Sequence, residues 1–210
     1  MTKTARYLMF ALLYFSQGAI MSFFTALNAL YLQSFGLDMS RVGLVGTIAM
    51  IPFVLKVFLG MLSDKINFLG LGHRKPYIVI GLLAQAFCLV LAPTIDPGRN
   101  FMQYAGLALA MMTGMALYDT CTDGLALDTT PTEEEGTIQG FMVGGRAAGM
   151  VVISAVLGMI VQRTSWSLGF YFLAIISLLP LPFVLFSREA ERVSGRQFEW
   201  SASAASRTRT

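Results

Sequence analysis

The chain has 210 residues, of which 55% are apolar and 13% are charged, with a formal net charge of +3. Soluble domains have about a quarter charged residues, so this composition excludes an ordinary soluble fold and indicates a membrane protein. The basic residues lie at the ends of apolar segments rather than in one patch, so we expect no nucleic acid partner. Zinc-protease, lipase and phosphate-loop motifs are absent from the sequence, which predicts a protein that is not an enzyme and uses no cofactor or metal.

Six apolar segments follow one another along the chain. A bilayer has a hydrocarbon core about 30 Å thick, which about 20 helical residues cross. The predicted spans are 6–35, 41–63, 76–91, 101–126, 137–161 and 168–186. We therefore expect an all-α membrane protein with six transmembrane helices within a domain of residues 1–187. The polar segment 188–210 is predicted to be a disordered tail.

The distribution of Lys and Arg predicts the orientation of the spans. With the N-terminus inside, ten basic residues lie in inner segments, and three lie in outer loops, namely Arg41, Arg99 and Arg163. Basic residues near helix ends stay in the cytoplasm. This excess predicts a multi-pass protein of the cell (inner) membrane, with both termini cytoplasmic and the lipid bilayer as its first partner.

Four charged residues lie within the predicted spans, where charge is expensive and often functional. They are Lys56, Asp119, Asp123 and Arg146. At 1.5 Å per residue, Lys56, Asp119 and Arg146 lie about 12–15 Å from the cytoplasmic ends of their helices, at a similar depth. Opposite charges at one depth can neutralise one another. Two interpretations stay open: a structural ion-pair network, or a pathway for substrate or protons.

The first span has a polar stripe within about a third of the helix circumference. Its members are Tyr14, Gln17, Thr25, Asn28 and Tyr31. Such a stripe faces the bundle interior or a water-filled cavity. Hydrogen bonding between helices and contact with a substrate are both compatible with it.

A glycine repeat marks the fifth span. Gly136, Gly140 and Gly144 recur at every fourth residue and therefore lie on one face of the helix. Small residues at this spacing allow close contact between membrane helices. We expect this face to pack against a neighbouring helix.

One loop resembles a known signature. The stretch GMLSDK, followed by a loop that ends GHRKPY, resembles the motif between the second and third helices of the major facilitator superfamily. The matching positions are Gly60, Asp64, Lys65, Arg74 and Lys75. The loop before the basic pair is longer than in the common form of the motif.

The longer stretch IPFVLKVFLGMLSDKINFLGLGHRKPY resembles one branch of that superfamily, the folate–biopterin transporters. It resembles the muropeptide and acetyl-CoA permeases less closely. Relatives carry a lysine after a proline in the second helix, as in Pro52 and Lys56, and paired aspartates in the fourth, as in Asp119 and Asp123. The segment GTIQGFMVGGRAAG, which contains Arg146, is similar to the fifth-helix pattern of the superfamily.

This resemblance implies alternating access by two six-helix halves, with a small solute bound between them. It implies that Asp64 caps a helix or pairs across the interface of the halves in the outward-facing state, and that Arg74 and Lys75 hold a cytoplasmic gate. Asp119 or Asp123 would be the carboxylate that couples transport to protons. The expected function is secondary active transport, proton-coupled or facilitated.

The six predicted spans amount to one half of such a transporter. Three alternatives stay open: a truncated or split product, a half-transporter that pairs with itself or with a separate chain, and a scaffold or assembly subunit of a membrane complex. The expected partners are therefore a small solute and a second six-helix half.

Overall fold

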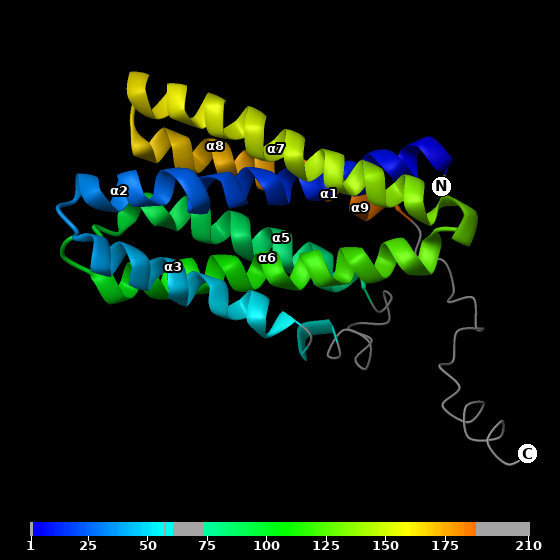
Figure 1. Cartoon of the computed structure of the whole chain (residues 1–210), viewed down its shortest axis with the longest axis horizontal. Helices are drawn as coiled ribbons and strands as arrows, with labels where there is room; N and C mark the ends of the chain where they lie inside the picture. Colours follow the sequence, from blue (N-terminus) through cyan, green and yellow to red (C-terminus); the bar gives the residue numbers. More distant parts are fainter. Residues whose placement is uncertain (1, 57, 61–73, 188–210) are drawn as a thin grey trace, which may run out of the picture.

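The computed structural model describes residues 2–56, 58–60 and 74–187. Every regular element in these residues is helical, and the helices run side by side with the N-terminus and the end of α9 at the same end of the bundle (Figure 1). The elements are α1 (Lys3–Ser22), η1 (Phe23–Leu27), α2 (Asn28–Ser34), α3 (Met39–Val54), α5 (Lys75–Leu91), η3 (Ala92–Thr94), α6 (Phe101–Thr129), η4 (Thr132–Glu134), α7 (Glu135–Arg163), α8 (Trp166–Leu178) and α9 (Leu181–Phe186).

Local signals in the sequence set several helix ends. Thr2, Asp38 and Ser165 cap the starts of α1, α3 and α8, since each side-chain oxygen accepts a hydrogen bond from a backbone N–H of the first turn. Such caps satisfy donors that have no partner within the helix. After α2 the chain turns at Gly36, whose φ of 78° favours glycine.

Four helical segments of the described residues are long and apolar enough to cross a membrane: Lys3–Ser34, Lys75–Thr94, Thr132–Arg163 and Trp166–Phe186. They agree with the first, third, fifth and sixth predicted spans, and the protein is a helical membrane protein.

The second and fourth predicted spans are not among the described segments that are long and apolar enough to cross a membrane. The span predicted at 41–63 overlaps the shorter helix α3, which begins at Met39 and ends at Val54, two residues after Pro52. Residues 58–60 are helical again. The fourth, α6, has 29 residues and contains three aspartates. That these two helices cross the membrane, and that the termini are cytoplasmic, stay predictions.

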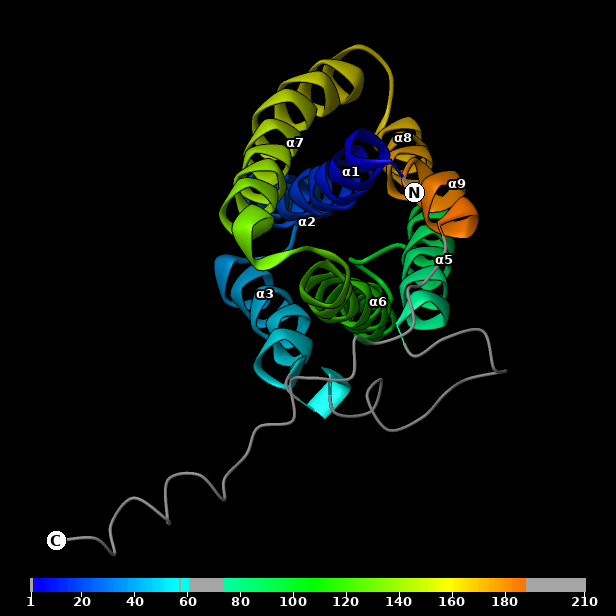
Figure 2. The same cartoon turned by 90° about the vertical axis from the view of Figure 1, so that its right-hand side faces the viewer.

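The helix α1 lies in the middle of the bundle, with α7, α8 and α6 around it (Figure 2). Its backbone touches that of α7 through glycines. A Cβ atom at Gly145 would overlap the carbonyl group of Ala11, and a Cβ atom at Gly149 would overlap that of Phe15. Gly18 of α1 lies against the α7 backbone in the same way. This contact leaves no room for a side chain.

The prediction that Gly136, Gly140 and Gly144 make the close contact is wrong for the described chain. A Cβ atom at any of these three positions would meet nothing within 4 Å. Spacing identifies a face of small residues but does not say which face meets a neighbour. The side chain of Arg146 turns toward α1 and α6, and this orientation brings Gly145 and Gly149 against α1 instead.

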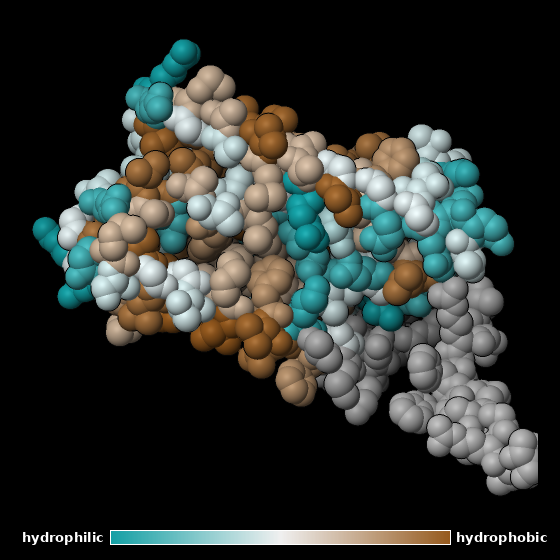
Figure 3. Space-filling model, in the orientation of Figure 1, coloured by the Kyte–Doolittle hydropathy of each residue, from teal (hydrophilic) through white to brown (hydrophobic). Residues whose placement is uncertain are grey.

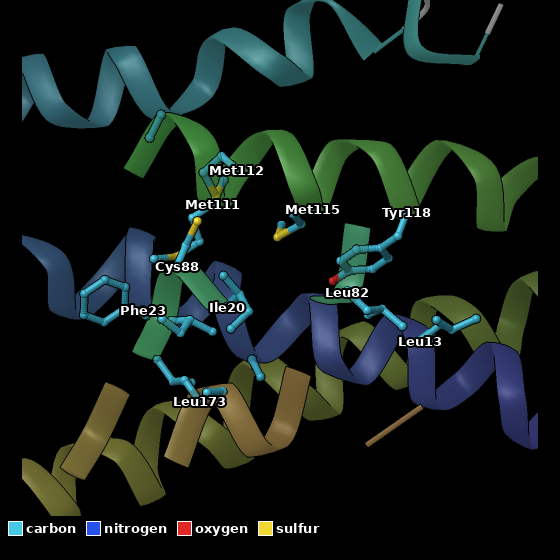
Figure 4. Packing of buried hydrophobic residues seen from close by; sticks show 14 of the residues in the cluster. Leu13, Ile20, Phe23, Leu82, Cys88, Met111, Met112, Met115, Tyr118 and Leu173 are labelled. Carbon is cyan, nitrogen blue, oxygen red and sulfur yellow. The ribbon is translucent and has the colours of Figure 1, made fainter. Parts of the chain in front are cut away.

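The core between α1, α5, α6 and α8 is largely apolar, although it includes the buried polar side chains of Ser16, Gln85 and Ser177. Figure 4 shows Met111, Met112 and Met115 of α6 beside Ile20 and Leu82, which belong to α1 and α5. Methionine is unbranched and fills irregular gaps between helices. A tight contact of Gly81 with Gly114 brings α5 against α6. The result is a closed bundle on this side of the molecule.

Candidate functional site

The intramembrane charges lie together on one side of the bundle. They form, with two residues of α1, what we call the charged cluster: Tyr14 and Gln17 of α1, Lys56 after α3, Asp119 and Asp123 of α6, and Arg146 of α7. Residues up to 132 positions apart in the sequence, since 146 − 14 = 132, thus meet at one place.

Asp119 is the centre of the cluster, and its side chain is only 2% exposed. Its Oδ1 accepts a hydrogen bond of 2.6 Å from Nε2 of Gln17 and lies 3.7 Å from Nη2 of Arg146. Its Oδ2 lies 3.4 Å from Nζ of Lys56. The Gln17 amide also accepts a hydrogen bond of 2.9 Å from Nε of Arg146. One buried carboxylate therefore connects α1, α6, α7 and the residue after α3.

Asp123 lies one turn further along the same face of α6 and is 40% exposed. It accepts a hydrogen bond from the hydroxyl group of Tyr14, and its Oδ2 lies 3.9 Å from Nζ of Lys56. The guanidinium group of Arg146 lies over the Tyr14 ring, with Cζ 4.7 Å from the centroid. Lys56 is thus placed between two carboxylates, and Arg146 rests on an aromatic face.

Three members of the cluster are open to the outside of the bundle. The side chains of Lys56 and Arg146 are each 41% exposed, and the side chain of Asp123 is 40% exposed. Figure 3 shows a band of hydrophilic side chains across this face, beside a largely apolar region. Charges at membrane depth do not face lipid, so the open side of the cluster needs water or another protein segment beside it.

Asn28, which the polar stripe grouped with Tyr14 and Gln17, lies apart from the cluster. It is buried, and its side-chain oxygen accepts a hydrogen bond of 3.1 Å from the hydroxyl group of Tyr104. It lies 11 residues beyond Gln17 (28 − 17 = 11), which is about 16 Å along the helix axis. The π-helical turn of Phe23–Leu27 between them also rotates the residues after it relative to a straight α-helix. An extrapolation at 100° per residue misses this rotation.

The loop signature is described in part. Gly60 lies close to α6, where an added Cβ atom would come 3.0 Å from Cγ2 of Thr120. Asp64 and Lys65 lie outside the described residues. Their predicted gating role therefore stays a prediction.

The basic pair after the loop has partners within the same bundle. Nε of Arg74 lies 2.6 Å from Oδ2 of Asp128, near the end of α6. Nζ of Lys75 donates hydrogen bonds of 2.6 and 2.7 Å to the carbonyl oxygens of Leu185 and Ser187. A cation at the C-terminal end of a helix satisfies carbonyl groups without partners and complements the helix dipole. The pair holds the start of α5 against α6 and α9.

A second ionic contact closes the end of the bundle near the N-terminus. Glu134 pairs with Lys3 at 2.9 Å and with Arg6, and accepts a hydrogen bond of 2.9 Å from Tyr7. Sequence reasoning counted the basic residues as topology signals only and gave the acidic loop no role. The signal that could have identified the contact is the acidic loop between two helices next to a basic N-terminus. Within the described ranges no group of three His, Cys, Asp or Glu residues could hold a metal ion.

The chain matches the model of the BT1 family over residues 17–207. It is 26% identical over 171 residues to the folate-biopterin transporter of Synechocystis sp., an alignment that covers 80% of this chain and 34% of that protein. It is 25% identical over 177 residues to the probable folate-biopterin transporter 8, chloroplastic, of Arabidopsis thaliana, with 84% and 32% covered. The alignments therefore span about a third of the length of these relatives. They confirm the resemblance to folate–biopterin transporters and agree with a protein that is not an enzyme.

Proposed function

Because the chain belongs to the BT1 family, we propose that it forms a six-helix part of a secondary transporter that moves a small solute by alternating access. The names of its relatives suggest folate or biopterin as the solute. The proposed location is the cell (inner) membrane, with both termini in the cytoplasm. The observation that carries the proposal is the charged cluster, which is open on one side at the middle of an apolar bundle.

The geometry of the cluster favours handling of protons or solute over a purely structural role. The distances from Lys56 to the two carboxylates are 3.4 and 3.9 Å, longer than a normal hydrogen bond. The pair of Arg74 and Asp128, in contrast, is closed at 2.6 Å. Loosely paired and partly exposed charges can exchange partners with a ligand or lose one by protonation. A tight pair fixes two helices.

Asp119 and Asp123 are both candidates for the coupled carboxylate in this proposal. Asp119 is buried and anchored by Gln17, and Asp123 is partly exposed. A carboxylate that loses its charge no longer attracts Lys56, which then pairs with the other carboxylate alone. Protonation thereby changes how the residue after α3 is held against α6. A second six-helix half, from the same protein, another copy or a separate chain, covers the open side of the cluster.

Uptake by the protein in proteoliposomes tests the proposal. We expect a pH gradient, acidic outside, to stimulate uptake of radiolabelled folate or biopterin several-fold. The double variant Asp119→Asn, Asp123→Asn loses this stimulation. Asp38→Asn is the matched control, since asparagine caps a helix as well as aspartate does and Asp38 lies at the opposite end of α3 from the cluster. If the double variant keeps gradient-driven uptake, the coupling role is wrong.

A second candidate function is that of a scaffold or assembly subunit that moves no solute. The observation in its favour is the low burial of α7, where only 17% of the most apolar window is buried, against 39% in the span of α8 and α9. The mass of the protein in detergent separates the two. A dimer supplies the second half that transport needs. A monomer that copurifies with another membrane protein and transports nothing supports the scaffold.

A further inference from the structure

An open pocket lies where α3 and α6 begin. In Figure 1 the starts of these helices lie at the end of the bundle opposite the N-terminus. Its volume is about 560 Å³. The polar part of its wall consists of Arg41, Arg99, Asn100 and Gln103, and the apolar part of Leu44, Phe101 and Met102. We call it the arginine pocket. It lies apart from the charged cluster, and the proposed function assigns it no role.

Two of the three basic residues of the predicted outer loops line this one pocket, although they are 58 positions apart in the sequence, since 99 − 41 = 58. The Arg41 guanidinium lies over the Phe101 ring, with Cζ 5.7 Å from the centroid. The Arg99 side chain is 86% exposed and lies 3.6 Å from Asp96 through its Nε. Both guanidinium groups are accessible to a ligand.

The two neighbouring carboxylates accept hydrogen bonds from backbone N–H groups. Asp38 accepts a hydrogen bond of 2.9 Å from the backbone N–H of Arg41, and Asp96 accepts one of 2.8 Å from that of Gly98. The contact of Asp96 with Arg99 is exposed and longer than a hydrogen bond, so an anion can compete for Arg99. In the described part of the chain, no carboxylate lies within ion-pair distance of the Arg41 side chain.

We propose that the arginine pocket binds the phosphate group of an anionic phospholipid. Two guanidinium forks match the oxygen geometry of a phosphate, and the two carboxamides add donors. The apolar wall is exposed, with Leu44 at 45% and Met102 at 72%, and offers a surface for the first methylene groups of an acyl chain. Both helices begin here, at the level of the lipid headgroups if α3 and α6 span the membrane. The polar wall suits a phosphate group and the apolar wall suits an acyl chain, and a phospholipid has both.

Thermal unfolding of the purified protein in neutral detergent tests the site with three probes: phosphatidylglycerol, phosphatidylcholine and inorganic phosphate. We expect phosphatidylglycerol to raise the Tm by about 3–5 °C at ten times its Kd, and the other two to raise it by much less. The variant Arg41→Gln, Arg99→Gln loses this difference between the lipids. The matched control is Arg163→Gln, which removes the third basic residue of the same end, and it keeps the difference.

Four results would overturn the proposal, three of them in the unfolding experiment and one by mass spectrometry. An equal loss in Arg163→Gln would mean that overall surface charge, not the pocket, attracts the lipid. Equal shifts from the two lipids would exclude headgroup recognition, and an equal shift from inorganic phosphate would mean a free anion as the ligand. If the double variant does not fold, Arg99→Gln replaces it, since that side chain is exposed. Native mass spectrometry then counts the bound phosphatidylglycerol, and an unchanged count contradicts the proposal. The result is independent of whether the protein transports a solute.

Discussion

The helix α1 is attached to its neighbours in two different ways. Along α7, backbone meets backbone, and Gly145 and Gly149 lie against carbonyl groups of α1 with no side chain between them. At the charged cluster, side chains from α1, α6, α7 and the residue after α3 meet over 2.6–3.9 Å, and several are partly exposed. The first contact fixes a distance between two helices, and the second can rearrange.

This difference indicates which parts of the bundle can move separately. Backbone contact through glycines makes α1 and α7 one unit, because any shift would replace close packing by a gap. Lys56, which follows α3, makes two long contacts, one with the buried Asp119 and one with the partly exposed Asp123. A change of charge in the cluster therefore acts first on α3 relative to α6, and not on the pair of α1 and α7.

The largest expected effect concerns the glycine contact. Gly149→Ala places a Cβ atom on the Phe15 carbonyl group and lowers the free energy of unfolding by about 1–3 kcal/mol, because the two helices must separate. Gly140→Ala, where a Cβ atom would meet nothing within 4 Å, leaves stability unchanged or raises it by up to about 1 kcal/mol through helix propensity. Thermal unfolding of both variants in one detergent measures the difference. Equal stabilities would contradict the glycine contact.

The sequence predicted the helices better than it predicted their faces. The span expected at 137–161 is α7 at Glu135–Arg163, and the one at 76–91 is α5 at Lys75–Leu91. Apolar length sets these bounds, and it is a local property. The face of α7 that meets α1 depends on where Arg146 finds its partners, and those are residues of other helices. No local pattern contains that information.

The candidate site, like the fold, could be predicted in part from the sequence. Equal depth from the helix ends suggested that Lys56, Asp119 and Arg146 could neutralise one another, and these three side chains lie together in the structure. Their role in transport stays a prediction. Asn28 was grouped with Tyr14 and Gln17 because a straight helix places them on one face, and the π-helical turn of Phe23–Leu27 has no signal in the sequence that we recognise.

A medium effect is expected for the ion pair between Lys56 and Asp119. Lys56→Ala leaves Asp119 with Arg146 and Gln17, so the loss of stability is about 1 kcal/mol, reduced by the exposure of Lys56. Asp119→Ala costs more, about 1–2 kcal/mol, since it leaves two cations without their shared partner. The double variant shows partial rescue, with a coupling of about 0.5–1 kcal/mol.

The control cycle for this pair combines Lys56→Ala with Asp96→Ala. Asp96 lies in the loop before α6, at the other end of the bundle. We therefore expect the stability changes of Lys56→Ala and Asp96→Ala to add. Chemical or thermal unfolding of the six proteins in one detergent gives both couplings. Additive effects of Lys56→Ala and Asp119→Ala would show that the 3.4 Å contact contributes nothing to folding.

The smallest expected effect distinguishes the two contacts of Tyr14. Tyr14→Phe removes the hydroxyl group that donates to Asp123 but keeps the ring under the Arg146 guanidinium. Water can replace the hydroxyl group at a carboxylate that is 40% exposed, so we expect a loss of only about 0.5–1 kcal/mol in the free energy of unfolding. Tyr14→Leu also removes the cation–π contact and costs about 0.5–1 kcal/mol more. If both variants are equally stable, the ring contributes nothing and the hydroxyl group alone links α1 to Asp123. If Tyr14→Phe costs more than Asp119→Ala, then Asp123, and not Asp119, is the anchor of the cluster.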